Sequence, residues 1–226
     1  MDVSSYLEWP FFTPEHSELV KRVDAWATGY FSGRKTSEDR DSVDHACRQL
    51  VSELGRAGWT RYSVPGTHGQ SASSPPAFDV RSLALIRETL ARHDALADFA
   101  FAMQGLGSGA ISLAGSPAIK ERYLPRVASG EAIAAFALSE AAAGSDVAAI
   151  RCRARREGDS YVLDGEKTWI SNGGIAEFYC VFARTADAEV RADGTVAARG
   201  ISAFVVDADT PGFSISQRIE IGRAHV

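Results

Sequence analysis

This sequence has no long apolar run and no excess of basic residues. No stretch is long enough to cross a bilayer. The acidic N-terminus is not followed by the apolar segment that a signal peptide requires. The formal net charge is −5, which leaves no electrostatic footprint for nucleic acid. We therefore expect a cytoplasmic protein that binds neither nucleic acid nor a membrane.

Cysteine and histidine are scarce and widely spaced. The three cysteines, Cys47, Cys152 and Cys180, show no metal-type spacing, and the five histidines form no HxxxH pattern. We interpret the cysteines as buried free thiols, and we expect no metal site.

Residues 1–131 show the 3.6-residue periodicity of amphipathic helices. Thr13 and Pro14 have the residue types of a helix N-cap and first position, and Asp79 is placed to cap a later helix. Residues 94–113 are nearly all small or apolar, which predicts a buried central helix. These patterns predict a helical domain over residues 1–131.

The pattern changes after residue 131. Two runs rich in β-branched and aromatic residues predict strands, residues 178–183 and 201–206. Residues 161–170 predict a hairpin that turns at Asp164 and Gly165. We therefore expect an α+β chain in which residues 132–220 form an incomplete antiparallel β-barrel or sandwich domain.

Two short stretches of the second half carry the functional signal. Residues 135–146 run from an apolar segment into a small-residue loop, whose backbone N–H groups can approach a phosphate. Residues 165–174 place an indole beside a hydroxyl residue and then turn at Asn-Gly-Gly. Taken singly, these features are more typical of a core tryptophan, a turn and solvated hydroxyls. Together they provide what a flavin needs: an apolar surface for its ring, hydrogen bonds to the ring heteroatoms and a binding loop for its pyrophosphate.

These motifs, in this order, resemble the acyl-CoA dehydrogenase family over nearly the whole chain. Residues 139–146 resemble the family's Thr-Glu-Pro-Gly-Ala-Gly-Ser-Asp signature, and residues 164–174 resemble Asn-Gly-x-Lys-x-Trp-Ile-Thr-Asn-Gly. Residues 105–125 resemble the end of the family's helical domain, and residues 208–213 a further family stretch. The resemblance implies FAD as cofactor and α,β-dehydrogenation of an acyl-CoA substrate in fatty acid metabolism. It also implies an electron-transfer flavoprotein as electron acceptor and a homo-oligomeric assembly.

The resemblance assigns roles to the first stretch. Phe136, Leu138 and Ser139 would line the flavin ring, with the Ser139 hydroxyl bonded to its pyrimidine end. Gly144 and Ser145 would meet the FAD pyrophosphate, and Ser145 would also lie near the acyl-CoA.

The second stretch would complete the cofactor site. Trp169 and Ile170 would contact the flavin, with Trp169 against the face away from the substrate, and Ser171 would hydrogen-bond the N5 edge. Serine stands at positions 139 and 171 where threonine is common in the family, and it keeps the hydroxyl. Residues 141–142 are Ala-Ala where the family usually has Pro-Gly, which predicts a stiffer loop.

The family's catalytic base is a glutamate of its C-terminal helical domain. Glu140, Glu166 and Glu177 lie nearest the motifs, but none matches that base, so we name no catalytic residue. Residues 221–226 resemble a translated sequencing adapter. We therefore expect a truncated fragment with an artefactual tail, one that alone neither holds FAD tightly nor turns over acyl-CoA.

Two other functions fit the same residues. One is oxygen chemistry on this fold, as in an acyl-CoA oxidase or a flavin monooxygenase. The other is a non-catalytic binding protein that inherited the fold.

Overall fold

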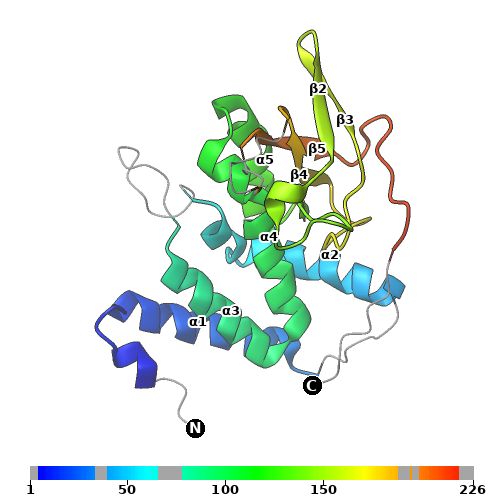
Figure 1. The fold of residues 1–226 in the computed structure, drawn as a ribbon. Helices are drawn as coiled ribbons and strands as arrows, with labels where there is room; N and C mark the ends of the chain where they lie inside the picture. The colour runs from blue at the N-terminus through cyan, green and yellow to red at the C-terminus, as the bar shows by residue number, and fades with distance from the viewer. Residues whose placement is uncertain (1–4, 34–39, 66–77, 188–193, 195–198, 219–226) are drawn as a thin grey trace. The chain divides into compact units, whose positions relative to one another are not determined.

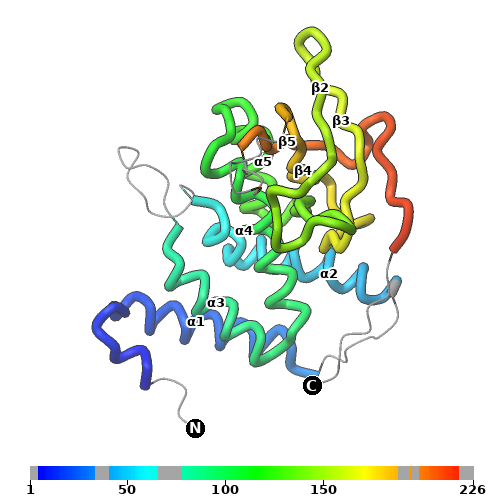
Figure 2. Tube along the Cα trace, viewed as in Figure 1, coloured from blue at the N-terminus to red at the C-terminus, as the bar shows by residue number. Residues whose placement is uncertain are grey.

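The chain forms two compact units that divide between Ala132 and Ile133. The computed structural model describes residues 5–33, 40–65, 78–187, 194 and 199–218. The first unit is helical and the second is built on a β-sheet (Figure 1, Figure 2). The α+β class expected from the sequence is confirmed. The tail at residues 221–226 lies outside the described residues.

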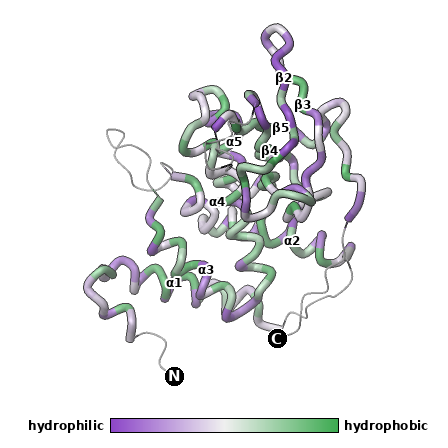
Figure 3. The backbone as a smooth tube through the Cα atoms, viewed as in Figure 1, coloured by the Kyte–Doolittle hydropathy of each residue, from purple (hydrophilic) through white to green (hydrophobic). Residues whose placement is uncertain are grey.

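The helical unit is arranged around one central helix. Its helices are α1 (Pro14–Phe31), α2 (Arg40–Arg56), α3 (Val80–His93), α4 (Ala95–Ala114) and α5 (Pro117–Ala128), with short 3₁₀ turns at Ser5–Glu8 and Thr60–Ser63. α4 contacts α2, α3 and α5, and α1 packs on α3. The apolar colouring along α4 agrees with this central place (Figure 3). Phe101 of α4, Leu54 of α2 and Ile86 of α3 are each fully buried, and α4 contacts both of the other helices.

Polar side chains fix where the helices begin. Thr13 is the N-cap of α1, with Pro14 at the first helical position. Asp79 caps α3 by accepting a hydrogen bond from the Arg81 backbone N–H. Both helix starts follow the local residue preferences from which the sequence predicted them.

In its described residues, the second unit forms a five-stranded mixed sheet. Its strands are β1 (Ala134–Ala137), β2 (Arg153–Glu157), β3 (Ser160–Asp164), β4 (Phe178–Arg184) and β5 (Ile201–Asp207). β5 pairs with β4 along its whole length, so β1 and β2 share the opposite edge of β4. Among the residues that the structure describes, β3 pairs with β2 alone and the sheet is open.

The prediction of an antiparallel sheet is wrong in part, because the sheet is mixed. β2 and β3 are antiparallel, and so are β4 and β5, but β4 runs parallel to both β1 and β2. Parallel partners need a long crossover, and the segment between β1 and β4 is long enough to provide it. Strand composition indicated the strands but not their directions.

The hairpin turns at residues 158–159 and not, as predicted, at Asp164 and Gly165. β2 and β3 are joined through Gly158 and Asp159, with Gly158 at φ +60°. Gly165 instead allows a close approach: a Cβ there would lie 2.7 Å from the Cα of Cys152. Residues 167–170 form no strand. The Gly-Asp pair was the hairpin signal, because glycine supplies the positive φ that a two-residue turn needs.

The cysteines are buried and free, as expected. Burial raises the pKa of the Cys180 thiol to about 11. Within the described ranges, no group of three or more His, Cys, Asp or Glu side chains could hold a metal ion. None of the helices described there combines the length and apolarity needed to cross a membrane.

Candidate functional site

The first stretch leaves the sheet at the end of β1. Phe136 is half-buried in β1, with its ring centroid 5.0 Å from that of Phe182. Leu138 and Ser139 follow the strand and are also half-buried. Glu140 and Ala143 then exchange two backbone hydrogen bonds of 3.0 Å each. The two intervening alanines therefore form a tight turn without the proline and glycine usual in the family.

Gly144 and Ser145 lie beyond this turn and are exposed. A Cβ built on Gly144 would meet no heavy atom within 4 Å. The backbone at this point is therefore open to a ligand.

The second stretch holds two non-glycine residues in the left-handed region. Trp169 has φ +60° and Asn172 has φ +63°. For a bulky residue such as tryptophan this conformation is a strained outlier. The Trp169 side chain is nevertheless 65% exposed, so packing of the indole does not account for the strain.

Asn172 fixes the second stretch to the sheet. It is 7% exposed, and its side-chain amide Nδ2 donates to the Ala134 carbonyl of β1 at 2.9 Å. Its own carbonyl accepts the N–H groups of Ile175 and Ala176, each at 3.0 Å. Asparagine tolerates the left-handed conformation better than most residues, which suits it to this turn.

Direct hydrogen bonds bring the two stretches together. The Thr168 N–H donates to the Ser139 carbonyl at 2.9 Å. The Lys167 ammonium donates to the Leu138 carbonyl at 2.9 Å. Leu138 and Ser139 are thus joined to the residues just before Trp169, while Ile170 and Ser171 follow it, half-buried. These bonds hold Leu138 and Ser139, at the start of the small-residue loop. Gly144 and Ser145 lie further along the same loop.

Glu140 and Lys167 are site residues to which sequence reasoning gave no role. They form an ion pair at 2.7 Å, and each side chain is 9% exposed. Burial by itself would raise the pKa of Glu140. Hydrogen bonds from Lys167 and from the backbone N–H groups of Arg151 and Cys152 outweigh burial and lower that pKa. One signal was available: Lys167 is one of four lysines in a chain with twenty arginines.

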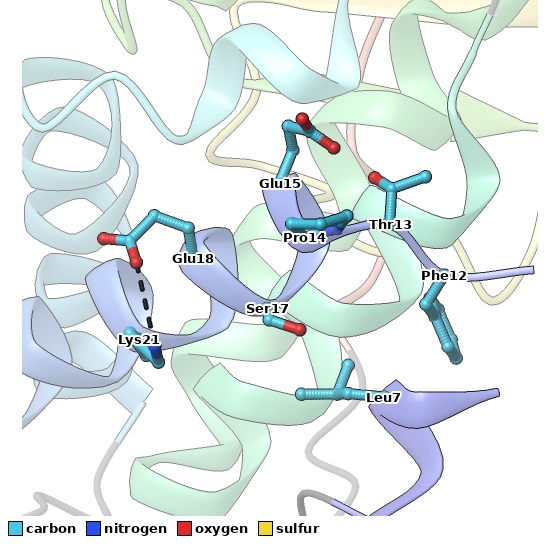
Figure 4. A pocket seen from close by; sticks show the side chains of 8 residues that line it. All are labelled: Leu7, Phe12, Thr13, Pro14, Glu15, Ser17, Glu18 and Lys21. Carbon is cyan, nitrogen blue, oxygen red and sulfur yellow. Dashed lines mark ion pairs between the residues drawn. The ribbon is translucent and has the colours of Figure 1, made fainter. Parts of the chain in front are cut away.

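A surface hollow lies elsewhere, in the helical unit at the start of α1 (Figure 4). Its volume is about 670 Å³. It is lined by Leu7, Phe12, Thr13, Pro14, Glu15, Ser17, Glu18 and Lys21. None of the predicted cofactor contacts belongs to this lining, so the hollow shares no residue with the candidate flavin site.

The sequence matches known domains over most of its length. Residues 13–131 match the N-terminal domain of acyl-CoA dehydrogenases, and residues 135–225 match their middle domain. The chain therefore belongs to the acyl-CoA dehydrogenase family. The resemblance drawn from the motifs is confirmed.

Individual relatives agree with this assignment. A probable acyl-CoA dehydrogenase of Mycobacterium leprae is 36% identical over 208 residues, covering 90% of this chain and 49% of that protein. The mitochondrial isovaleryl-CoA dehydrogenase of Pongo abelii is 31% identical over 207 residues, covering 91% of this chain and 47% of that protein. The chain thus spans about half the length of these curated relatives.

A solved structure shows the same fold with a flavin bound. The acyl-CoA dehydrogenase from Bacillus anthracis, complexed with FAD, matches with a TM-score of 0.70 at 30% identity. The match covers 93% of this chain and 34% of that one.

Proposed function

We propose that this chain forms the N-terminal and middle parts of an FAD-dependent acyl-CoA dehydrogenase, and that its two motif stretches together bind the flavin. The observation that carries the proposal is Trp169, whose indole is 65% exposed on a backbone at φ +60°. Strained backbone concentrates at ligand sites, where the surrounding structure over-determines it. An exposed flat indole held in place by such a turn is suited to pack against a flavin ring.

The other predicted contacts fit the flavin ring in residue type. Phe136, Leu138 and Ile170 offer half-buried apolar surface, and Ser139 and Ser171 offer hydroxyls that can donate or accept. FAD, when bound, supplies the acceptor for the hydride that leaves the β carbon of the acyl thioester. The chain's own residues hold the ring, exclude water from it and offer hydrogen bonds at its edges.

Gly144 and Ser145 fit a phosphate-binding role. Both are exposed, and the absence of a Cβ on Gly144 leaves its backbone open to an anion. Consecutive backbone N–H groups in such a loop form an anion-binding concavity. We assign the FAD pyrophosphate to this loop, with Ser145 also serving the acyl-CoA.

The remaining parts of the reaction are predictions for the whole protein. Because this chain spans about half the length of its relatives, no residue of it is assigned as the base that takes the α proton. An electron-transfer flavoprotein as electron acceptor and a homo-oligomeric assembly likewise remain predictions.

The test uses the whole purified protein loaded with FAD. A panel of saturated acyl-CoA thioesters of different chain lengths is added without oxygen, and flavin absorbance is followed. We expect the oxidised flavin band to bleach with at least one thioester, and an artificial electron acceptor to restore it. A protein that binds no FAD, or whose bound flavin no thioester bleaches, would contradict the proposal.

A further inference from the structure

Glu140 and Lys167 form a nearly buried ion pair between the two stretches of the candidate site. The Lys167 Nζ lies 2.7 Å from the Glu140 Oε1, and both side chains are 9% exposed. Opposite charges in such a place gain from mutual attraction but lose their hydration, so the pair adds little net stability compared with an apolar pair of similar size. A gain in stability is therefore a weak explanation for the pair.

The further bonds of each partner point to a positional role. The Glu140 carboxylate accepts the N–H groups of Arg151 at 2.6 Å and Cys152 at 2.9 Å, which ties the start of the small-residue loop to its end. Lys167 Nζ also donates to the Leu138 carbonyl at 2.9 Å. The ion pair thus joins three segments: the end of β1, the entry to β2, and the residues that lead into Trp169.

The far end of the same loop has a second anchor. Arg184, at the end of β4, is 7% exposed. Its guanidinium donates to the Ile150 carbonyl at 2.8 Å and also to the Ala148 carbonyl. Residues 141–147, including the proposed phosphate contacts, are therefore a loop whose two ends are each held by a charged side chain.

We propose that the Glu140–Lys167 pair is a positioning clamp, which sets the Trp169 turn and the Gly144–Ser145 loop in the relative arrangement that FAD binding requires. The inference rests on the proposed function. Neither residue is assigned contact with the flavin, and both act through the backbone segments they hold. A carboxylate and an ammonium suit this task because their bonds to backbone groups are charge-assisted and directional.

The test compares three variants of the whole protein with a matched control. Glu140→Gln and Lys167→Met each leave one buried charge without its partner, whereas the double variant removes both charges at similar volume. Glu157→Gln is the control, because it breaks the exposed Arg155–Glu157 pair in the same sheet. The readouts are amide hydrogen exchange at Arg151, Cys152 and Thr168 without FAD, the denaturant midpoint, and the FAD dissociation constant.

We expect both single variants to lower the midpoint and to speed exchange at the three amides. In the double variant the midpoint should recover towards that of the unaltered protein. Its exchange should stay fast, and its FAD dissociation constant should stay raised about tenfold, the scale on which outer-shell partners act at metal sites. The control should change none of the three readouts.

A double variant that binds FAD as tightly as the unaltered protein would reduce the pair to a structural role and overturn the inference. Unchanged exchange at the three amides in every variant would also overturn it. Failure of the unaltered protein to bind FAD is a different outcome, because it rejects the proposed function and the clamp's role in it together.

Discussion

Trp169 combines a strained backbone with an exposed ring. Its φ of +60° is costly for a bulky residue, and 65% of its side chain is in solvent. The turn is held from outside, by the Thr168 N–H on the Ser139 carbonyl and by Asn172 on β1. Removing the indole should therefore affect a ligand more than the fold.

The first prediction follows from this contrast. Trp169→Leu is expected to weaken FAD binding about tenfold, since a stacked aromatic contact contributes about 0.5–1.5 kcal/mol beyond its buried area. Stability should change by less than about 1 kcal/mol, as for most exposed positions. Flavin fluorescence titration and urea unfolding measure the two effects.

Trp9→Leu is the matched control. This residue is 56% exposed and is not among the proposed flavin contacts, so FAD affinity should be unchanged. An equal loss of FAD affinity in both variants, or no loss in Trp169→Leu, would contradict the proposed packing of Trp169 against the flavin ring.

The residue types of the candidate site could be predicted from the sequence. The contacts that hold these residues in place could not. Trp169, Ser139 and Ser171 stand in recognisable motifs. The contact of Lys167 with Glu140 joins residues 27 positions apart, and no local pattern reports it.

Among the elements, the helices were predicted best because their signals are local. Periodicity and caps act within a few residues, and the starts of α1 and α3 agree with the sequence. The antiparallel direction predicted for the strands was wrong for β4 with β1, because that pairing depends on residues far apart in the chain.

The start of α3 provides a pH-dependent test. Burial would raise the pKa of Asp79, but hydrogen bonds from Ser82, Arg81 and His16 outweigh it and lower the pKa to about 2. In the unfolded chain that pKa is about 4. The carboxylate therefore stabilises the folded state above about pH 4, and this contribution is lost as the pH falls from about 4 to about 2.

Asp79→Asn should make the loss of stability between pH 4 and pH 2 shallower. At pH 7 the cost should be about 0.5–1 kcal/mol, because Asp79 is 40% exposed and solvent screens its charge. Urea unfolding of the helical signal across the pH series measures both effects. A pH profile as steep as that of the unaltered protein would show that Asp79 does not contribute.

A glycine sets how closely α2 approaches the end of α5. A Cβ on Gly55 would lie 2.0 Å from the Ser129 carbonyl oxygen. Gly55→Ala should therefore destabilise the helical unit by about 1–3 kcal/mol, the usual cost of overpacking.

Gly29→Ala in α1 is the control, because a Cβ there would meet nothing within 4 Å. That variant should gain up to about 1 kcal/mol from helix propensity. Thermal unfolding of the two variants compares them directly. A neutral Gly55→Ala would mean that α2 and α5 can separate without loss.

At the scale of the whole molecule, family membership rests on both units. The N-terminal and middle domains match in order, and the chain spans about half the length of its curated relatives. The candidate site as described lies within the sheet unit, where a backbone hydrogen bond and the bonds of the Lys167 side chain join its two stretches. The central claim is that these stretches form one flavin-binding surface.

Hydrogen exchange of the whole protein with and without FAD tests that claim most directly. FAD should slow exchange in peptides that cover residues 138–146 and 165–174, and leave the β2–β3 turn at Gly158 unchanged. Protection confined to other parts of the chain, or to one of the two stretches alone, would contradict the account.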